Sequence, residues 1–379
     1  MPTDELGEGN EGDGDGGDAV AGEDGRPLAA VVAKQEGDAA IERLRAEGVY
    51  DATRKVREFD ADTIAVPVTD PPETEGLRVV RQPGARRLHG LEDHLRERGW
   101  TDREIDRAPA SWAVLGTVIL VDIDGTPHPG ELGEALLDVH GGADTVLARG
   151  GIAGPHREPE VEVIAGAGDT ETVHTEHGTR YAMDLAEVMF SPGNKAERAR
   201  MGEVVGAGER VVDMFAGIGY FTLPMARADA DVTAIERNPA AFRYLLENVR
   251  LNDVEAAVHP YRADCRDVLR AAASPPRSDG VGRSDPAREG DETDVTADRV
   301  VMGYYDAHEY LDSALGALAP GGVVHVHEAT PEPLVFERPA ERVRAAAAER
   351  GRTVEILDTR RVKTHSEGVI HVVVDARVD

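Results

Sequence analysis

The sequence predicts an α/β protein in which two small modules precede a doubly wound parallel sheet. From about residue 195, apolar strand segments alternate with helix segments, as in a parallel sheet covered by helices on both faces. Between about residues 80 and 190, short strands and turn glycines follow a helical stretch, which indicates an α+β module. Before residue 70, a strand–helix–strand pattern predicts a small α/β module.

The first module is expected over residues 27–70. LAAVVAK has the composition of a strand, DAAIERLRAEG has helical spacing and ends at a glycine, and TIAVPVT predicts a further strand. Residues 1–26 are acidic and glycine-rich and cannot bury enough apolar surface to fold, so we expect a disordered tail. The proline-rich segment VTDPPETEG connects this module to the next.

The second module is expected over residues 80–190. It begins with the helical stretch LEDHLRERGWTDREIDRAP and continues with the strands WAVLGTVILVDI and TVLARGG. The segment VEVIAGAGDTETVHTEHGTRYAMDL alternates polar and apolar residues between turn glycines. We therefore expect it to form an antiparallel meander.

The third domain is expected over residues 191–379. Its strands are expected in the segments RVVDMF, DVTAIE, AAVHPYRAD, DRVVMGY, GGVVHVHEA, TVEILDTRRVK and GVIHVVVDARV. Helices are expected in FTLPMARA, PAAFRYLLENVRLN, AHEYLDSALGAL and PAERVRAAAAERG. The last two strands follow each other closely and predict a hairpin that supplies an antiparallel edge. Residues 274–297 are polar, and we expect them to form an exposed acidic insertion between the third and fourth strands.

The composition is strongly acidic. The chain of 379 residues has 72 acidic and 42 basic residues, a formal net charge of −30 and 4% aromatic residues. Such a surface suits a protein that stays soluble in concentrated salt, so we expect a halophilic source; the alternative is an ordinary acidic protein with an acidic tail. The net charge opposes nucleic-acid binding, but molar salt screens charges beyond roughly 3 Å. An RNA partner is therefore not excluded, and Arg78, Arg81, Arg86 and Arg87 form a local basic cluster.

The compartment is expected to be the cytoplasm. Cys265 is the only cysteine, so no intrachain disulfide can form. No apolar run approaches the ~20 residues that a membrane span requires, so we expect no membrane partner. The N-terminus is acidic, unlike the basic and apolar regions of a signal peptide. The sequence does not fix the oligomeric state, and a monomer is expected.

The strongest local signal is DMFAGIGYF at residues 213–221, which follows a strand and opens a helix. Gly217 and Gly219 allow the backbone to approach a ligand closely, and a helix N-terminus presents free N–H groups. A dinucleotide fingerprint requires a third glycine where Thr222 stands, and Asp213 would repel phosphate. A cationic or amino-bearing ligand fits better; a tight structural turn is the alternative.

Two carboxylates follow at the ends of the next two strands. Glu236 ends the second strand about 20 residues after the loop, where a carboxylate can accept both ribose hydroxyls. Asp264 ends the third strand, where it can meet an adenine amino group. An acidic loop, a ribose carboxylate and an adenine carboxylate on three successive strands predict S-adenosylmethionine. A dinucleotide, or no cofactor at all, are the alternatives.

A further signal, FSPGNKAER at residues 190–198, precedes the first strand of this domain. Its position suits a lid or hinge over the cofactor, with Arg198 holding the methionine carboxylate in a charge-assisted pair. The alternative is an ordinary helix N-terminus, with Ser191 as its cap and surface charges after it.

Five segments together resemble the archaeal tRNA enzymes that modify guanosine 37, next to the anticodon. They are FSPGNKAERARM, VVDMFAGIGYFTLPMA, AIERNPAAFRYLLENVRLN, RADCRDV and RVVMGYYDAHEYLDSAL. The resemblance covers roughly residues 28–379 and leaves out the acidic tail and the insertion. It implies a class I S-adenosylmethionine-dependent transferase with a Rossmann-like seven-stranded sheet. Two branches share this architecture: the guanine-37 N1-methyltransferases and the wybutosine-pathway aminocarboxypropyltransferases.

The segment after the fourth strand distinguishes the two branches. Methyltransferases of this kind typically carry an Asn-Pro-Pro-like motif there, whose carbonyls hold the amino or imino group that receives the methyl. Residues 302–305 are instead Met-Gly-Tyr-Tyr, as in the aminocarboxypropyltransferase branch. The serine-bearing FSPGN, in place of an arginine-bearing version, and the strand VVHVHEAT point the same way.

The resemblance then implies a reaction. The 3-amino-3-carboxypropyl group of S-adenosylmethionine is transferred to C7 of 4-demethylwyosine in tRNA(Phe), and 5′-methylthioadenosine is released. The donor residues implied are Ser191, Arg198, Asp213, Phe215, Gly217, Gly219, Glu236, Asp264 and Cys265; those at the acceptor and the reacting groups are Gly303, Tyr304 and His327. An aromatic face such as Tyr304 can stack on a splayed-out base, although ordinary packing under the following helix is the alternative.

The histidines of the fifth strand could also be interpreted as metal ligands. His325 and His327 alternate, so both point to one face, and with Glu328 and His308 they could suggest a metal site. No cysteine or further spaced ligand supports it, and we expect no metal. Orientation of the substrate or buried hydrogen bonding is the expected role.

Three functions remain to be distinguished: an aminocarboxypropyltransferase, a guanine-37 N1-methyltransferase, and an RNA-binding protein with a vestigial cofactor site. The resemblance implies that the front modules recognise RNA, with the four arginines of the basic cluster on phosphates; oligomerisation is the alternative. The base that removes the proton from C7 is not assigned by the sequence.

Overall fold

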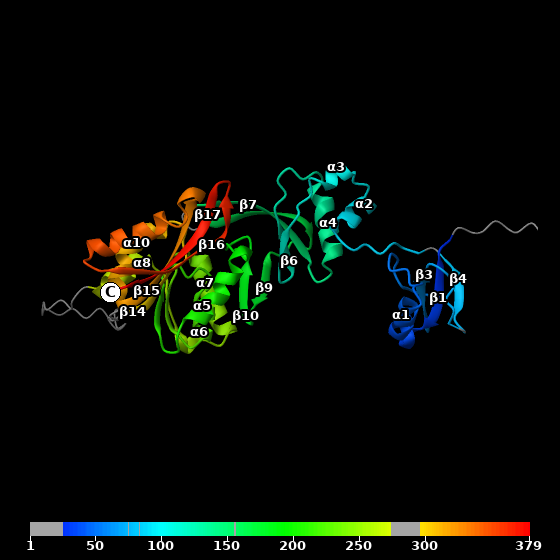
Figure 1. The fold of residues 1–379 in the computed structure, drawn as a ribbon, viewed down its shortest axis with the longest axis horizontal. Helices are drawn as coiled ribbons and strands as arrows, with labels where there is room; N and C mark the ends of the chain where they lie inside the picture. Colours follow the sequence, from blue (N-terminus) through cyan, green and yellow to red (C-terminus); the bar gives the residue numbers. More distant parts are fainter. Residues whose placement is uncertain (1–25, 75, 83, 155–156, 274–295) are drawn as a thin grey trace, which may run out of the picture. The chain divides into compact units, whose positions relative to one another are not determined.

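The computed structural model describes residues 26–74, 76–82, 84–154, 157–273 and 296–379. The chain divides into two compact units between Asp93 and His94, and Figure 1 shows the fold of each. The expected tail and insertion lie outside the described residues, apart from Arg26, Thr296 and Ala297, and Ala297 already begins a strand. No helix in the described ranges is long and apolar enough to cross a membrane.

The described residues of the first unit form a four-stranded antiparallel sheet and one complete α-helix. The strands β1 (Leu28–Ala33), β2 (Arg57–Glu58), β3 (Thr63–Val68) and β4 (Arg78–Arg81) are arranged in the order β2-β3-β1-β4. A 3-10 turn, Lys34–Glu36, leads into α1 (Gly37–Ala46). Leu44 of this helix shares a buried core with Val32 and Val66 of the sheet. The strand–helix–strand pattern is therefore present, with two further short strands.

A small sheet and its helices come next; the first of these helices spans the boundary between the units, and the other elements belong to the second unit. These elements are α2 (Leu91–Glu97), α3 (Asp102–Ile105), β5 (Trp112–Leu115), β6 (Val118–Val121), α4 (Pro129–Val139), β7 (Thr145–Ala153) and β8 (Glu158–Gly166). The strand order is β5-β6-β7-β8, and only β6 and β7 pair in parallel. The sequence did not predict α4, which connects these two parallel strands and packs against β7 and β8.

The expectation of one continuous meander is wrong. β8 pairs with β7, whereas β9 (Glu171–Glu176) and β10 (Thr179–Asp184) form a separate hairpin. The hairpin instead contacts α7 (Pro239–Leu251): the amide of Asn248 accepts from the N–H of Ala182 at 2.6 Å and donates to its carbonyl at 3.0 Å. This buried amide ties the hairpin to the larger sheet domain.

A seven-stranded sheet forms the rest of the second unit. Its strands are β11 (Arg210–Asp213), β12 (Asp231–Ile235), β13 (Val258–Tyr261), β14 (Ala297–Met302), β15 (Leu318–Pro331), β16 (Val354–Ser366) and β17 (Val369–Val378). The order is β13-β12-β11-β14-β15-β17-β16. The first five strands are parallel and β17 is antiparallel to both of its neighbours, which confirms the Rossmann-like sheet with an antiparallel edge.

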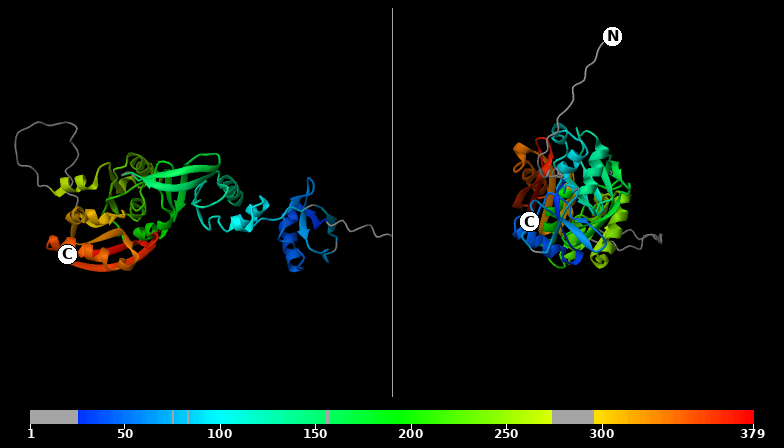
Figure 2. Two further views of the ribbon diagram at one scale, coloured as in Figure 1. Left: turned by 90° about the horizontal axis from the view of Figure 1, so that it is seen from above. Right: turned by 90° about the vertical axis from the view of Figure 1, so that its right-hand side faces the viewer.

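Helices cover both faces of this sheet (Figure 2). They are α5 (Lys195–Val204), α6 (Thr222–Arg227), α7, α8 (Cys265–Ala273), α9 (Leu311–Ala317) and α10 (Arg338–Glu349), with 3-10 turns at Pro192–Asn194, Glu255–Ala257, Ala307–Tyr310 and Glu332–Leu334. One buried cluster joins α5, α6 and α7 to the sheet, and a second joins α8, α9 and α10 to it. The sequence predicts neither α8 nor the full extent of α5.

Candidate active site

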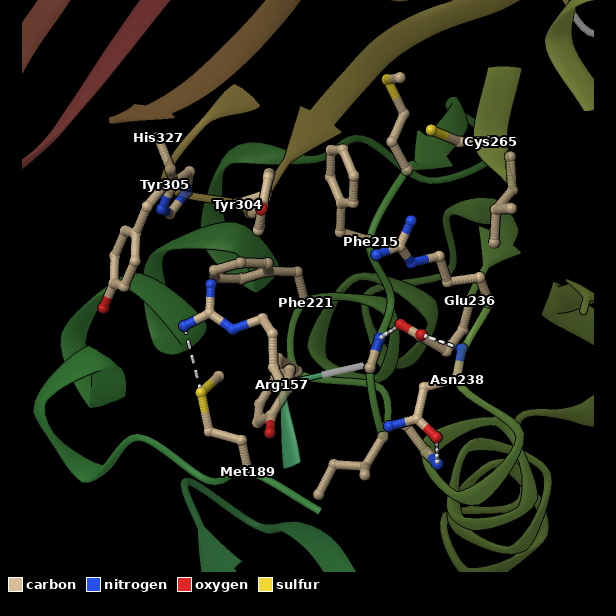
Figure 3. A pocket seen from close by; sticks show the side chains of 18 of the residues that line it. Arg157, Met189, Phe215, Phe221, Glu236, Asn238, Cys265, Tyr304, Tyr305 and His327 are labelled. Carbon is tan, nitrogen blue, oxygen red and sulfur yellow. Dashed lines mark hydrogen bonds between the residues drawn. The ribbon is translucent and has the colours of Figure 1, made fainter. Parts of the chain in front are cut away.

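A pocket lies at the carboxyl ends of β11, β12, β13 and β14, where open parallel sheets bind ligands beside the reversal of strand order. Side chains from β15, β17 and the β7–β8 connection complete its wall (Figure 3). The sequence-predicted residues that line it are Ser191, Arg198, Phe215, Gly217, Glu236, Asp264, Cys265, Gly303, Tyr304 and His327. The other two, Asp213 and Gly219, do not line the pocket.

The glycine loop after β11 is shaped by sterics. Gly217 and Gly219 have φ of 56° and 103°, which disfavour other residues. A Cβ on Gly217 would lie 2.4 Å from the ring of Tyr220, and one on Gly219 would lie 2.8 Å from Cγ of Leu223. Gly217 borders the pocket, whereas Gly219 serves the tight turn into α6.

Asp213, at the end of β11, holds this loop through hydrogen bonds on the side away from the pocket lining. Its side chain is fully buried and accepts hydrogen bonds from the hydroxyl of Thr222 at 2.8 Å and from the N–H of Phe215 at 3.3 Å. Burial raises the pKa of Asp213 to about 6, although these hydrogen bonds oppose the rise. Thr222, which replaces the third glycine of a dinucleotide fingerprint, thus connects the strand to the first turn of α6.

Glu236 is the carboxylate next to the loop. Its Oε2 accepts from the N–H of Gly217 at 2.8 Å, and its Oε1 accepts from the N–H of Asn238 at 2.6 Å (Figure 3). Burial raises the pKa of Glu236, and the two N–H groups oppose that rise. Each oxygen retains a further lone pair, so the oriented carboxylate can accept two hydroxyl groups of a ligand.

The end of the pocket after β13 combines charge with an aromatic ring. The guanidinium of Arg266 bonds to Asp264 at 2.9 and 2.7 Å and lowers the pKa of this carboxyl to about 2. The same guanidinium lies 4.8 Å from the ring centroid of Tyr310. Cys265 is buried, which raises the pKa of its thiol to about 12, so it remains a neutral packing residue. This environment suits a planar heterocycle with an amino group.

Arg198 lines the pocket and also bonds to protein groups, while its expected role toward the methionine carboxylate stays a prediction. Its Nε and one terminal nitrogen donate to Glu176 on β9 at 2.7 and 2.9 Å, and its other terminal nitrogen donates to the carbonyl of Ser191 at 2.9 Å. The guanidinium is 2% exposed and lies 4.6 Å from the ring centroid of Phe190. Arg198 therefore anchors the 190–198 segment to the β9–β10 hairpin.

Ser191 does not cap the following turn with its side chain. Its hydroxyl instead accepts a hydrogen bond from Nζ of Lys363 on β16. Burial, together with the positive charges of Arg149 and Arg198, lowers the pKa of Lys363 to about 8. The segment before β11 is thus connected to the last hairpin of the chain.

Aromatic rings form the wall at the end of β14. Tyr304 lies 5.2 Å from Phe215, centroid to centroid, and Phe215 meets Tyr310 edge-on at 5.0 Å. A Cβ on Gly303 would lie 2.7 Å from the ring of Phe221, so only glycine lets this ring stay in place. Tyr304 and Phe215 belong to the aromatic packing of this face and also border the pocket.

Arg157 reaches this wall from the β7–β8 connection. Its guanidinium carbon lies 5.6 Å from the ring centroid of Tyr304 and 5.0 Å from that of Tyr305, and one nitrogen contacts the sulfur of Met189 at 3.4 Å (Figure 3). The backbone of Arg157 is left-handed, with φ of 56°. The connection between two strands of the four-stranded sheet β5–β8 thereby contributes a cation to the pocket at the edge of the seven-stranded sheet.

The two histidines of β15 have different surroundings. His325 is bonded to Asp375 at 2.6 Å and to Arg299 at 2.5 Å, and it does not line the pocket. His327 lines the pocket, and its Nδ1 lies 3.0 Å from Nε2 of His371. Within the described ranges, no group of three or more His, Cys, Asp or Glu side chains is arranged to hold a metal.

Several pocket residues were not found from the sequence. Asn238 could have been found, because Asn-Pro before a helix is a capping signature, and its Oδ1 accepts from the N–H of Ala240 at 2.9 Å. His371 is a polar residue in the apolar run VIHVVV, which is a weak signal of a buried site. Arg157 has no local signal, since only the tertiary fold brings it to Tyr304.

Two family models match the chain. One, described as the TYW2 N-terminal domain, matches residues 91–170. The other, described as the TRM5/TYW2 methyltransferase domain, matches residues 172–275 and 284–357. The two matches together include β5–β8, the β9–β10 hairpin and most of the pocket.

Individual relatives agree with these matches. The tRNA(Phe) (4-demethylwyosine(37)-C(7)) aminocarboxypropyltransferase of Pyrococcus horikoshii is 36% identical over 299 residues, which is 77% of this chain and 99% of the relative. The tRNA (guanine(37)-N(1))-methyltransferase Trm5b of Pyrococcus abyssi is 31% identical over 93% of this chain and 99% of the relative. The structure of P. horikoshii TYW2 in complex with MeSAdo matches with a TM-score of 0.59 and 34% identity, covering 75% of this chain and 96% of that one. The chain therefore belongs to the TYW2 family of tRNA(Phe) (4-demethylwyosine(37)-C(7)) aminocarboxypropyltransferases, which is related to Trm5.

Proposed function

We propose that this chain transfers the 3-amino-3-carboxypropyl group of S-adenosylmethionine to C7 of 4-demethylwyosine at position 37 of tRNA(Phe), with release of 5′-methylthioadenosine. The observation that carries the proposal is the acceptor side of the pocket. Gly303, Tyr304 and Tyr305 follow β14 where the N1-methyltransferase branch has its Asn-Pro-Pro-like motif. An aromatic wall there suits a flat tricyclic base that reacts at carbon, and not a ring nitrogen held by amide carbonyls.

The donor side of the pocket fits S-adenosylmethionine. Glu236 offers two oriented oxygens to ribose hydroxyls, and the ionised Asp264 offers an acceptor to the adenine amino group. When bound, the sulfonium supplies an activated carbon, and presenting the γ-carbon of the methionine part transfers the carboxypropyl group. Cys265 stays a neutral thiol, and no protein nucleophile is needed for a direct transfer to C7.

The acceptor would stack against Tyr304 and Phe215. The guanidinium of Arg157 lies against Tyr304 and Tyr305 and restricts both rings in the pocket wall. Phe221 occupies the space beside Gly303 and limits how deeply the base can enter. Alignment of C7 with the donor carbon and sulfur is then the main contribution to rate, because oriented reactants avoid much of the entropy cost of meeting.

A double-label assay tests this function. The enzyme is incubated with tRNA carrying 4-demethylwyosine and with S-adenosylmethionine labelled either in the methyl group or in the carboxypropyl group. We expect only the carboxypropyl label in tRNA, together with an equal amount of 5′-methylthioadenosine. Methyl label in the tRNA would instead assign the chain to the N1-methyltransferase reaction. Retained tRNA binding with neither label transferred would indicate a vestigial cofactor site.

A further inference from the structure

A hydrogen-bonded pair of histidines lies in the pocket wall. Nδ1 of His327 on β15 is 3.0 Å from Nε2 of His371 on β17. Both side chains line the pocket, and the two residues are 2% and 0% exposed. The other two ring nitrogens, Nε2 of His327 and Nδ1 of His371, are buried and have no hydrogen-bond partner among the described residues.

Two ring nitrogens without hydrogen-bond partners in one pocket wall indicate that a bound ligand supplies the missing partners. Leaving a buried polar atom unpaired costs about 1–3 kcal/mol. A neutral imidazole has one donor nitrogen and one acceptor nitrogen. In a hydrogen-bonded pair, one outer nitrogen must therefore be an acceptor and the other a donor. A proton accepted at one end can leave from the other end without any lasting charge on the pair.

The surroundings keep the pair neutral. Burial, together with the positive charge of Arg360, lowers the pKa of His327 to about 3. Burial, with smaller contributions from nearby His327 and Lys363, lowers the pKa of His371 to about 2. A proton that enters the pair is therefore not stored and must be passed on.

Aromatic rings restrict the access of water to the pair. Phe221 lies 5.1 Å from His327, centroid to centroid, and Tyr305 meets His371 edge-on at 4.9 Å. Tyr305 also contacts His365, which is exposed on β16. The Tyr305 ring thus lies between His371 and the exposed His365, and the His327 end of the pair lies beside the Phe221 ring next to Gly303.

We propose that this pair removes the proton that C7 loses in the transfer, with Nε2 of His327 as the acceptor and His371 as the relay. The inference rests on the proposed function. As C7 bonds to the donor γ-carbon, the carbon–sulfur bond breaks and its electrons remain on sulfur, which leaves C7 tetrahedral and the base cationic. The C7–H electrons then return to the ring while the proton moves to Nε2 of His327. The Nδ1 proton of His327 passes to Nε2 of His371, and the Nδ1 proton of His371 passes to water.

Such a base does not need to be strong. A hydrogen on a tetrahedral carbon of a cationic ring is acidic, because its loss restores the aromatic system. A neutral imidazole that passes the proton onward is sufficient for this step. Exchange with water then returns the pair to its first tautomer before the next turnover.

The test uses acceptor tRNA with hydrogen or deuterium at C7 and follows the aromatic product by its near-ultraviolet absorbance in single turnovers. We expect the wild-type rate to be insensitive to deuterium, because proton removal is fast. His327→Asn keeps a polar group where Nδ1 was but lacks Nε2; we expect a rate lower by roughly 10²-fold or more and a normal deuterium isotope effect. His371→Gln keeps the hydrogen bond to His327 but cannot relay, and we expect a smaller loss, again with an isotope effect.

His325→Asn is the matched control, since it places the same substitution two residues earlier on β15, outside the pocket lining. It is expected to introduce no isotope effect, whatever it does to stability. Calorimetric binding of S-adenosylmethionine checks that each variant is folded. Slow variants without a deuterium effect, or His327→Asn at the wild-type rate, would overturn the relay alone. Absence of carboxypropyl label from the wild-type product would overturn the proposed function and the relay with it.

Discussion

At the scale of single residues, the ion pair between Arg198 and Glu176 contributes to stability through burial. Both side chains are at most 4% exposed, and hydrogen bonds from His174 and Arg198 outweigh the effect of burial and lower the pKa of Glu176 to about 2. Arg198→Ala leaves a buried carboxylate without its partner, so we expect the free energy of unfolding to fall by about 3–5 kcal/mol in urea denaturation. The double variant Arg198→Met/Glu176→Leu removes both charges and should lose less. If both variants lost the same free energy of unfolding, the unpaired buried carboxylate would not be the cause of the loss in Arg198→Ala.

Asp213 gives a second prediction at this scale, on pH. Its pKa rises from an ordinary value of 3.8 to about 6 in the folded protein, so the folded state binds the proton more tightly than the unfolded state. The contribution of Asp213 to stability is therefore highest below about pH 4 and is lost as the pH rises through about 6. A shift of roughly two units corresponds to about 3 kcal/mol.

The measurement compares wild type with Asp213→Asn, which can bond to both Thr222 and Phe215 but does not titrate. Relative to the variant, wild type should lose up to about 3 kcal/mol of unfolding free energy between pH 4 and pH 7. Because other carboxyl groups titrate in both proteins, only the difference between the two curves is diagnostic. Parallel curves would show that Asp213 keeps its ordinary pKa.

At the scale of elements, the β7–β8 connection brings Arg157 to the acceptor wall. Arg157→Ala removes the guanidinium from Tyr304 and Tyr305, and we expect transfer to slow by roughly 10-fold while the affinity for S-adenosylmethionine is unchanged. Arg157→Lys should recover little, because an ammonium lacks the flat face that stacks on rings. The control is Arg149→Ala on β7, the strand before this connection; the exposed partner of Arg149 is Asp122. If Arg157→Ala weakened the binding of S-adenosylmethionine by as large a factor as it slowed transfer, Arg157 would act on the donor and not on the acceptor.

The sequence predicted those elements whose local pattern agrees with their tertiary position. The alternation from β11 to β17 was visible because strands buried on both faces have continuous apolar runs. The β8 segment was assigned to the wrong sheet, since its alternating pattern and turn glycines suit a neighbour on either side. Only the parallel pairing of β6 with β7, made through α4, decides that β8 joins β7.

In the pocket too, the sequence predicted the residues that a local pattern places there and missed those that only tertiary contacts bring in. Glu236 and Asp264 were found because the carboxyl ends of successive parallel strands converge on one edge. Arg198 was recognised as important, but its partner Glu176 lies on a hairpin that no local pattern connects to it. His371 enters the pocket because β17 lies beside β15, a pairing that spans more than forty positions of the chain, from His327 to His371.

At the scale of the whole molecule, an acidic chain would bind an acidic tRNA through local arginines. Arg86 and Arg87, exposed in the first unit, are proposed phosphate contacts. Arg86→Ala/Arg87→Ala should weaken tRNA binding and lower the slope of log affinity against log salt by about 2. The control Arg43→Ala/Arg45→Ala removes equal charge from α1 of the same unit and should change the slope less. Equal changes would point to a general effect of net charge.

The position of β17 between β15 and β16 also sets an order of events during synthesis. The loop after β11, Glu236 and Asp264 leave the ribosome more than a hundred residues before residue 371 does. A nascent chain can therefore form the donor side of the pocket while the middle of its sheet still exposes the open edge of β15. Arrival of β17 then covers that edge, brings His371 to His327 and completes the acceptor side in one step.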